Sequence, residues 1–164
     1  MKTGTYSTMF ALALALLTTS CASLAPAEQR KTQWVETTTQ TKATAYNRTL
    51  AYLSKNLGDS NHAVKMKDAD SGQIIAHMNV TCNQFRQGGD PHDYNLAFNL
   101  DFQAKDNRVR MTFEDMTMLD KNGAAVGWAY NQITDAKKAE DAKVCLAPVK
   151  EGILRALQGA NDYF

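Results

Sequence analysis

Residues 93–118 read DYNLAFNLDFQAKDNRVRMTFEDMTM, and this stretch decides the fold. Apolar and polar residues alternate from Tyr94 to Gln103, Lys105–Asn107 supply turn residues, and the alternation resumes up to Glu114. Successive side chains of a strand point to opposite faces, so the pattern predicts a half-buried antiparallel hairpin. Each large apolar side chain contributes about 1.5–3 kcal/mol on full burial, so the rest of the chain must supply a covering layer. The buried face would carry Tyr94, Leu96, Phe98, Leu100, Phe102, Val109, Met111 and Phe113.

Two segments have the apolar spacing of helices that could form this layer. In the first, Thr41 is a candidate N-cap and Gly58 a candidate C-terminal cap. A second helical region is expected to begin near residues 134–135. Its proline lacks a backbone N–H, so we expect a break or kink near Leu146–Pro148. The apolar residues at helical spacing in the first segment are Tyr46, Leu50, Leu53 and Leu57.

Three further strands are expected, over residues 33–40, 64–66 and 74–82, with a turn at Asp68–Gly72. The expected order is therefore β-α-β-β-β-β-α. Strands and helices in this order favour an antiparallel sheet of about five strands with helices packed on one face. The sequence thus predicts an α+β fold.

Composition supports one ordinary globular domain and selects no class of partner. The chain has 164 residues, of which 21% are charged, with 18 Lys and Arg against 17 Asp and Glu. It contains no block of like charge and no basic stripe with interleaved aromatic residues. We therefore expect no nucleic-acid partner.

The N-terminus has the pattern of a secretory signal peptide. Lys2 precedes an apolar run of nine residues, Met9–Leu17, and small residues follow it. A helix needs about 20 residues to cross a bilayer, so this run is too short to span one. The alternative, a buried core helix, would require a polar side that the segment lacks. We expect residues 1–20 to be the signal peptide, 21–32 a tether and 33–164 a single domain.

The end of this segment, LTTSC over residues 17–21, resembles the bacterial lipoprotein signal, with Leu17 four residues before the cysteine instead of three. The resemblance implies a diacylglyceryl thioether on Cys21 and an acylated amino terminus, such as palmitate. Ala22 is similar to residues that permit sorting to the outer membrane, so the expected location is that membrane, facing the periplasm or the cell surface. The alternative is an ordinary cysteine near a cleavage site.

Four short motifs carry a further resemblance: Lys42 with Tyr46, Leu50–Leu53, Asp70–Ile74, and Arg108 with Arg110. Together they resemble a bacterial family of domains of unknown function that is assigned a TBP-like (TATA-binding-protein-like) fold. The family is common in exported lipoproteins, and the resemblance covers roughly Trp34 to Leu119. It implies the fold but brings no activity with it.

Two cysteines remain for a disulfide if Cys21 is lipidated. Cys82 ends an apolar strand face, and Cys145 lies in the helical region expected to cover it. Exported proteins favour such a bridge, although two unpaired buried thiols are the alternative. No histidine lies at ligand spacing from either cysteine, which argues against zinc.

The candidate binding residues lie on the polar side of the sheet. His77, Asn99 and Arg110 are expected to share this face and could bind something, whereas a merely solvated face is the alternative. His92, within Asp90–Asp93, could contribute to a cation site or belong to an ordinary turn. We expect no cofactor and no metal.

No catalytic motif is present: no serine lies in a nucleophile elbow, and no phosphate-binding loop occurs. We therefore expect a non-catalytic binding or interaction domain at the cell envelope. Its partner would be an envelope protein or a small ligand, besides the membrane itself. The alternative is a small metal-dependent or hydrolytic enzyme that uses His77 or the Asp90–Asp93 loop.

Overall fold

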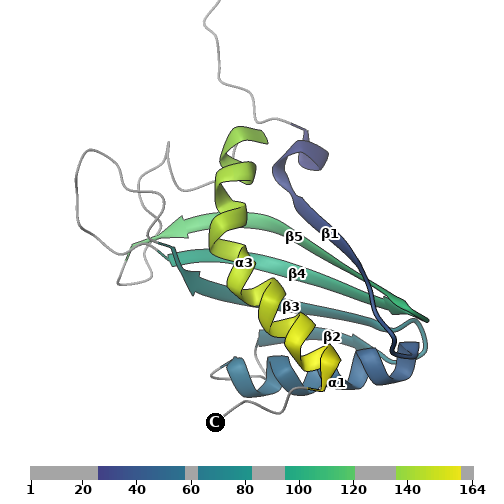
Figure 1. The fold of residues 1–164 in the computed structure, drawn as a ribbon. Coiled ribbons are helices and arrows are strands. Elements are labelled where there is room, and N and C mark those ends of the chain that lie inside the picture. Colours follow the sequence, from purple (N-terminus) through teal and green to yellow (C-terminus); the bar gives the residue numbers. More distant parts are fainter. Residues whose placement is uncertain (1–25, 58–62, 83–94, 121–135, 160–164) are drawn as a thin grey trace, which may run out of the picture.

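The computed structural model describes residues 26–57, 63–82, 95–120 and 136–159. Its centre is a five-stranded antiparallel sheet in the order β1-β5-β4-β3-β2, drawn in Figure 1. The fold class and the order of elements predicted from the sequence are confirmed. The strands are β1 (Thr32–Thr37), β2 (Val64–Asp68), β3 (Gln73–Thr81), β4 (Asn95–Lys105) and β5 (Arg108–Leu119).

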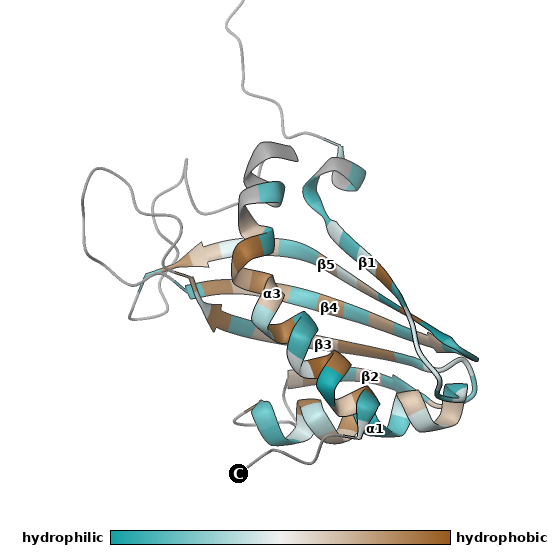
Figure 2. Cartoon of the chain, in the orientation of Figure 1, coloured by the Kyte–Doolittle hydropathy of each residue, from teal (hydrophilic) through white to brown (hydrophobic). Residues whose placement is uncertain are grey.

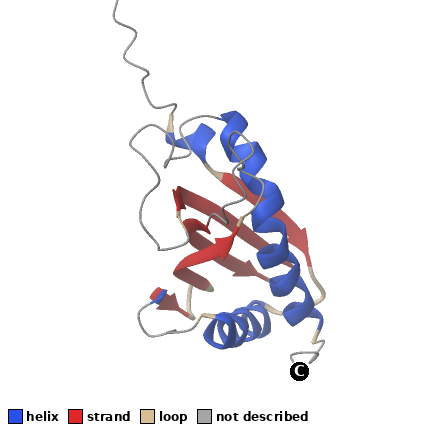
Figure 3. Cartoon of the chain, turned by 90° about the vertical axis from the view of Figure 1, so that its left-hand side faces the viewer, coloured by secondary structure: helices blue, strands red, loops and turns tan. Residues whose placement is uncertain are grey.

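Two long helices cover one face of this sheet. α3 (Ala136–Gln158) crosses the face diagonally, and α1 (Lys42–Asn56) packs against α3, β4 and β3 (Figures 1 and 3). A short 3-10 helix, η1 (Ala27–Arg30), lies within the segment expected as a tether and contacts α3 and β5. The apolar layer predicted for the hairpin therefore comes from both ends of the domain.

The central hairpin follows the predicted alternation through Phe113. Leu96, Phe98, Leu100 and Phe102 of β4 have no exposed surface, while the residues between them face the other side. In Figure 2 apolar and polar positions both occur along the strands, as this alternation requires. Seven of the eight predicted core residues are buried; the eighth, Tyr94, lies outside the described residues.

A β-bulge then shifts the phase of β5. Asp115 has φ 52°, and the ladder with β4 changes register between Ala97 and Asn99. The extra residue brings Met116 and Met118 to the core face, because it offsets the two-residue period by one. The same shift leaves Glu114 and Asp115 on the exposed side.

The start of α1 ties two turns together. The Thr41 hydroxyl accepts a hydrogen bond from the Thr44 amide, which confirms the predicted N-cap. The Lys42 amide donates to Asp106 Oδ1 at 2.8 Å in the β4–β5 turn, and Lys42 Nζ donates to the Asp70 carbonyl at 2.6 Å in the β2–β3 turn. The predicted C-terminal cap, Gly58, lies outside the described residues.

A break or kink was predicted near Leu146–Pro148, but α3 runs through Pro148 as one helix, so the break is wrong. Its axis curves but continues, as Figure 1 shows. Proline removes the hydrogen bond to the carbonyl four residues earlier, that of Val144. Val144 and Pro148 both lie on the exposed side of the helix, so water can satisfy this carbonyl. The free energy of folding lost through the missing hydrogen bond is therefore small.

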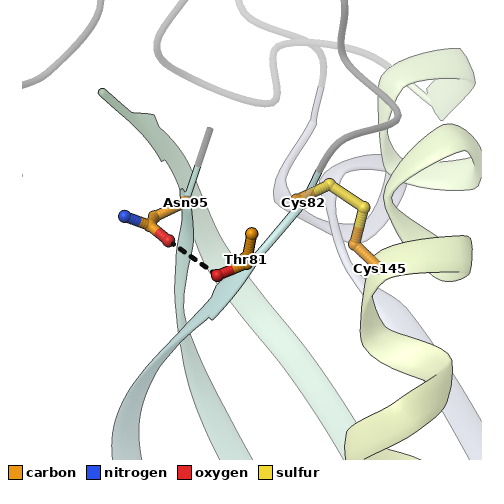
Figure 4. The surroundings of a disulfide bond; sticks show 4 residues. All are labelled: Thr81, Cys82, Asn95 and Cys145. Atoms are coloured by element: carbon orange, nitrogen blue, oxygen red, sulfur yellow. Dashed lines mark hydrogen bonds between the residues drawn. A yellow bond between two sulfur atoms is a disulfide. The ribbon is translucent and has the colours of Figure 1, made fainter. Parts of the chain in front are cut away.

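The disulfide joins β3 to α3. Cys82 follows the last residue of β3, and its Cα lies 5.2 Å from that of Cys145 (Figure 4). Both cysteines are buried, and the bridge closes a sequence separation of 63 residues. The predicted pairing is confirmed.

The contact between α1 and α3 depends on a glycine that the sequence analysis did not single out. Gly152 is buried in the middle of α3, and a Cβ there would lie 2.1 Å from the Tyr52 hydroxyl of α1. Nearby, Arg48 Nη1 donates to the Leu157 carbonyl at 2.5 Å. A cation at this position complements the negative end of the α3 dipole.

Candidate functional site

The open face is the side of the sheet opposite α1 and α3, and it carries mostly polar side chains. The strand registers place its residues in rows that cross β1, β5, β4 and β3. Among the described helices, neither α1 nor α3 covers it (Figure 3). Residues on this face include Gln33, Val35, Thr37, Arg108, Arg110, Thr112, Glu114, Asp115, Lys105, Gln103, Asp101, Asn99, Gln73, Ile75, His77 and Asn79.

Two charged side chains on the open face, Arg110 and Asp101, pair with amides instead of with opposite charges. Arg110 Nη2 donates to Gln103 Oε1 at 2.6 Å, and Gln73 Nε2 donates to Asp101 Oδ1 at 2.8 Å. An amide partner orders a charged group through a charge-assisted hydrogen bond without cancelling its charge. The face is therefore ordered and still carries local charge of both signs.

His77, Asn99 and Asp115 form a hydrogen-bonded chain across β3, β4 and β5. Asn99 Nδ2 donates to Asp115 Oδ2 at 2.8 Å, and Asn99 Oδ1 lies 3.0 Å from His77 Nδ1. Because the Asp115 carboxylate can only accept, the Asn99 amide must turn its NH₂ group toward Asp115 and its oxygen toward His77. His77 Nδ1 must therefore donate to Asn99 Oδ1. In neutral His77 this leaves Nε2 as an acceptor.

The three predicted face residues do not form one site. His77 and Asn99 are direct register partners and in hydrogen-bond contact, which the sequence did not predict beyond their sharing a face. Arg110 is on the same face but lies opposite Gln103, two outward-facing positions along β4 from Asn99. At about 3.3 Å per residue, this separates the two positions by roughly 13 Å along the strand.

The bulge gathers carboxylates at the centre of the open face. Burial raises the pKa of Glu114, and the neighbouring charges of Asp115 and then Asp101 raise it further. The described residues contain no group of three or more His, Cys, Asp or Glu side chains placed to hold a metal ion. The centre of the face is thus acidic.

The hairpin end of the face is basic and hollowed. A depression of ≈ 230 Å³, which we name the basic hollow, lies where β1, β5 and β4 run side by side. Among the residues of the hollow, only Arg110 was predicted to be a binding residue. The spacing of two residues between Arg108 and Arg110 nevertheless indicates that both lie on the same face. The hollow is lined by Gln33, Val35, Gln103, Lys105, Arg108, Val109 and Arg110.

A second hollow, of ≈ 420 Å³, lies between the end of β1 and the last turns of α3. Threonine side chains, Thr37–Thr39, and two leucines of α3 form part of its lining. Glu36, which also lines it, accepts from Lys150 Nζ at 2.9 Å, so its charge is already paired. This hollow carries no unpaired charge that would select a ligand.

Several predicted features lie outside the described residues. These are the lipidation site Cys21, His92 and the rest of Asp90–Asp93. Within the described residues, no helix is both long and apolar enough to cross a membrane.

Comparison with known proteins identifies the family. The sequence profile of a domain of unknown function (DUF4468) with TBP-like fold matches residues 32–118. The crystal structure of a TBP-like protein from Parabacteroides distasonis superposes with a TM-score of 0.56 at 12% identity, covering 78% of this chain and 92% of that one. A DUF4468 family protein from Bacteroides ovatus gives a TM-score of 0.49 at 7% identity, with 84% and 89% covered.

No curated protein gives a significant match. At 12% identity the Parabacteroides protein shares the fold with this chain, and the likeness says nothing of activity. The predicted fold family is confirmed by the profile, which spans more than half of the sequence. The chain therefore belongs to the DUF4468 family of domains with TBP-like fold.

Proposed function

We propose that this protein is a membrane-anchored lipoprotein of the cell envelope whose domain binds another envelope component through the open face, without catalysing a reaction. One observation carries the proposal: the open face is ordered by hydrogen bonds between side chains but keeps its charges unneutralised. Ordered side chains lose little conformational entropy on binding, and free charges provide complementarity to a charged partner.

The surroundings of His77 support a binding role over a catalytic one. Its Nδ1 hydrogen-bonds to the Asn99 amide, not to a hydroxyl or thiol that it could activate as a nucleophile. The two described cysteines are joined in the disulfide and are not available as thiolates.

Anchoring would hold the domain close to the membrane. The described chain begins at Pro26, and η1 already contacts α3 and β5. Only residues 22–26 then separate Cys21 from this helix, and five extended residues reach at most about 18 Å. The domain would act on partners within the envelope that lie beside the membrane.

Site-specific photo-crosslinking tests which face is used. A photoreactive residue replaces Asn79, an exposed residue of β3 next to His77, in the full-length protein in its own cells. The matched control replaces Lys143, a partly exposed residue of α3 on the other side of the sheet. We expect defined adducts from position 79 and not from position 143.

Replacing His77, Asn99 and Arg110 by alanine should remove the position-79 adducts while membrane fractionation is unchanged. Identical adducts from both positions, or adducts that survive the triple replacement, would show that the open face is not the binding surface.

A further inference from the structure

We propose that the basic hollow binds the phosphate group of a phosphoester ligand. The inference deepens the proposed function, and it rests on the open face being a binding surface. The hollow brings side chains of three adjacent strands around ≈ 230 Å³, a space larger than one phosphate group.

The strand register concentrates positive charge here. Lys105 pairs with Arg108 across the turn of the hairpin, and Arg110 follows Arg108 two residues later on the same face. Residues two apart on a strand lie about 6.6 Å from each other. Arg110 also has Val35 of β1 as its register partner on the other side. Three cationic side chains therefore border a single depression.

No described acid neutralises these cations by an ion pair. Two acids on the same hairpin make hydrogen bonds elsewhere: Asp101 accepts from Gln73, and Asp106 accepts from the backbone amide of Lys42. Because the whole chain is close to neutral, with a formal charge of +1, three cations that border one hollow without an ion-paired acid are a local excess. Such an excess attracts an anion.

Arg110 is held in place before any ligand arrives. Its Nη2 donates to Gln103 Oε1, whereas its Nε is buried and donates to no described atom. An arginine positioned in this way presents its remaining N–H groups with little loss of rotamer freedom. Gln103 and Gln33, which also line the hollow, add side-chain amides that can donate or accept.

The number of cations favours phosphate over carboxylate. A carboxylate is satisfied by one arginine fork, but a phosphate monoester has three acceptor oxygens and about two negative charges. Arginine and lysine donors from two strands match this larger demand. Val35 is 51% exposed at the same hollow and can contact the carbon atoms of the ester. A free phosphate monoester and the headgroup of phosphatidic acid, which is also a phosphate monoester, share this chemistry.

Titration calorimetry of the purified full-length protein, at constant ionic strength, tests the site. The probes are inorganic phosphate, glycerol phosphate and a short-chain phosphatidic acid below its micellar concentration, with acetate as the carboxylate control. The variants are Arg108→Gln, which changes an exposed side chain, and the double variant Arg108→Gln with Arg110→Gln. The matched control, Lys65→Gln with Lys67→Gln, removes two exposed cations from the opposite edge strand, β2.

We expect phosphate probes to bind and acetate not to bind. Arg108→Gln should weaken binding about tenfold and the double variant should abolish it, whereas the β2 control should stay within about twofold. Tighter binding of the short-chain lipid would assign the phosphate to a headgroup, and tighter binding of glycerol phosphate to a free phosphoester; both support the site.

Failure to bind any phosphate probe, equal binding of acetate, or equal weakening in the β2 control would overturn the inference. If one of these calorimetric results is obtained while crosslinking from position 79 still gives its adducts, the phosphate site is contradicted and the proposed function is not. If the protein with an otherwise wild-type open face gives no adducts from position 79 but still binds phosphate, the proposed function is contradicted instead.

Discussion

Gly72 closes the corner where three segments of the domain meet. Its φ of +74° is in the region that favours glycine, and its carbonyl accepts from the Ala104 amide at 2.9 Å. A Cβ at this position would lie 2.7 Å from the Ala104 carbonyl oxygen and 3.0 Å from the Lys42 side chain. In the same turn, Asp68 Oδ1 accepts from the amides of Ser71 and Asp70, and hydrogen bonds from Ser71 lower the pKa of Asp68.

Gly72→Ala should therefore lower the free energy of unfolding by about 1–3 kcal/mol, because the substitution adds both backbone strain and a contact with backbone that cannot easily move. Urea denaturation measures the change. Asp70→Ala is the matched control, since Asp70 is exposed and it is the Asp70 carbonyl and amide that make hydrogen bonds in the turn. Equal stability of Gly72→Ala and wild type would contradict the strain argument.

Glu114 makes stability depend on pH in a defined direction. A carboxyl whose pKa is raised in the folded state favours folding when protonated, and this contribution is lost as the pH rises through the folded pKa. Glu114→Gln should thus be slightly more stable than wild type at neutral pH, and the difference should vanish below about pH 4. The effect is small because Glu114 is exposed. Thermal melts across pH test it, with Glu140→Gln on α3 as the control.

At the scale of elements, the bridge fixes α3 over the end of β3. Closing a loop of 63 residues stabilises the folded state by about 4 kcal/mol in the chain-entropy model. Cys82→Ser and Cys145→Ser should each cost about 2–5 kcal/mol, and the double variant little more, because either change removes the same bond. Denaturation with and without reductant measures this: reductant should lower wild type to the level of the double variant. Additive losses would contradict the pairing.

The sequence predicted the elements from periodicity, and its errors arise where tertiary contacts override local patterns. The alternation up to Phe113 specifies the hairpin, and the reappearance of apolar residues at Met116 and Met118, one residue out of phase, was a visible sign of the bulge. A break or kink was predicted at Pro148 from its missing N–H; the helix does not break there because Pro148 is exposed, and the sequence alone could not show this exposure. Gly152 carries no local signal, since its role is the close approach of Tyr52 from another helix.

At the scale of the molecule, strand order decides which polar residues meet. β1, the first strand in sequence, pairs with β5, the last, and this pairing alone brings Val35 and Gln33 beside Arg108 and Arg110. No short-range pattern contains that pairing. The sequence could therefore predict that His77, Asn99 and Arg110 share a face, because alternation determines the face. It could not predict the basic hollow, because strand order and register determine which residues of that face lie beside one another.

The last prediction separates the expected anchor from the folded domain. If Cys21 carries the lipid, Cys21→Ser should abolish incorporation of a labelled fatty acid, because the thioether needs the sulfur. Several acyl chains contribute about 0.8 kcal/mol per buried methylene, so their loss should also release the protein from the membrane fraction. Melting of the domain should not change, since the core and the Cys82–Cys145 bridge lie entirely within the described residues that start at Pro26. Cys82→Ser is the reciprocal control: it should keep the label and lose stability. Retention of the label by Cys21→Ser would remove the lipoprotein proposal and leave the binding face to be tested on its own.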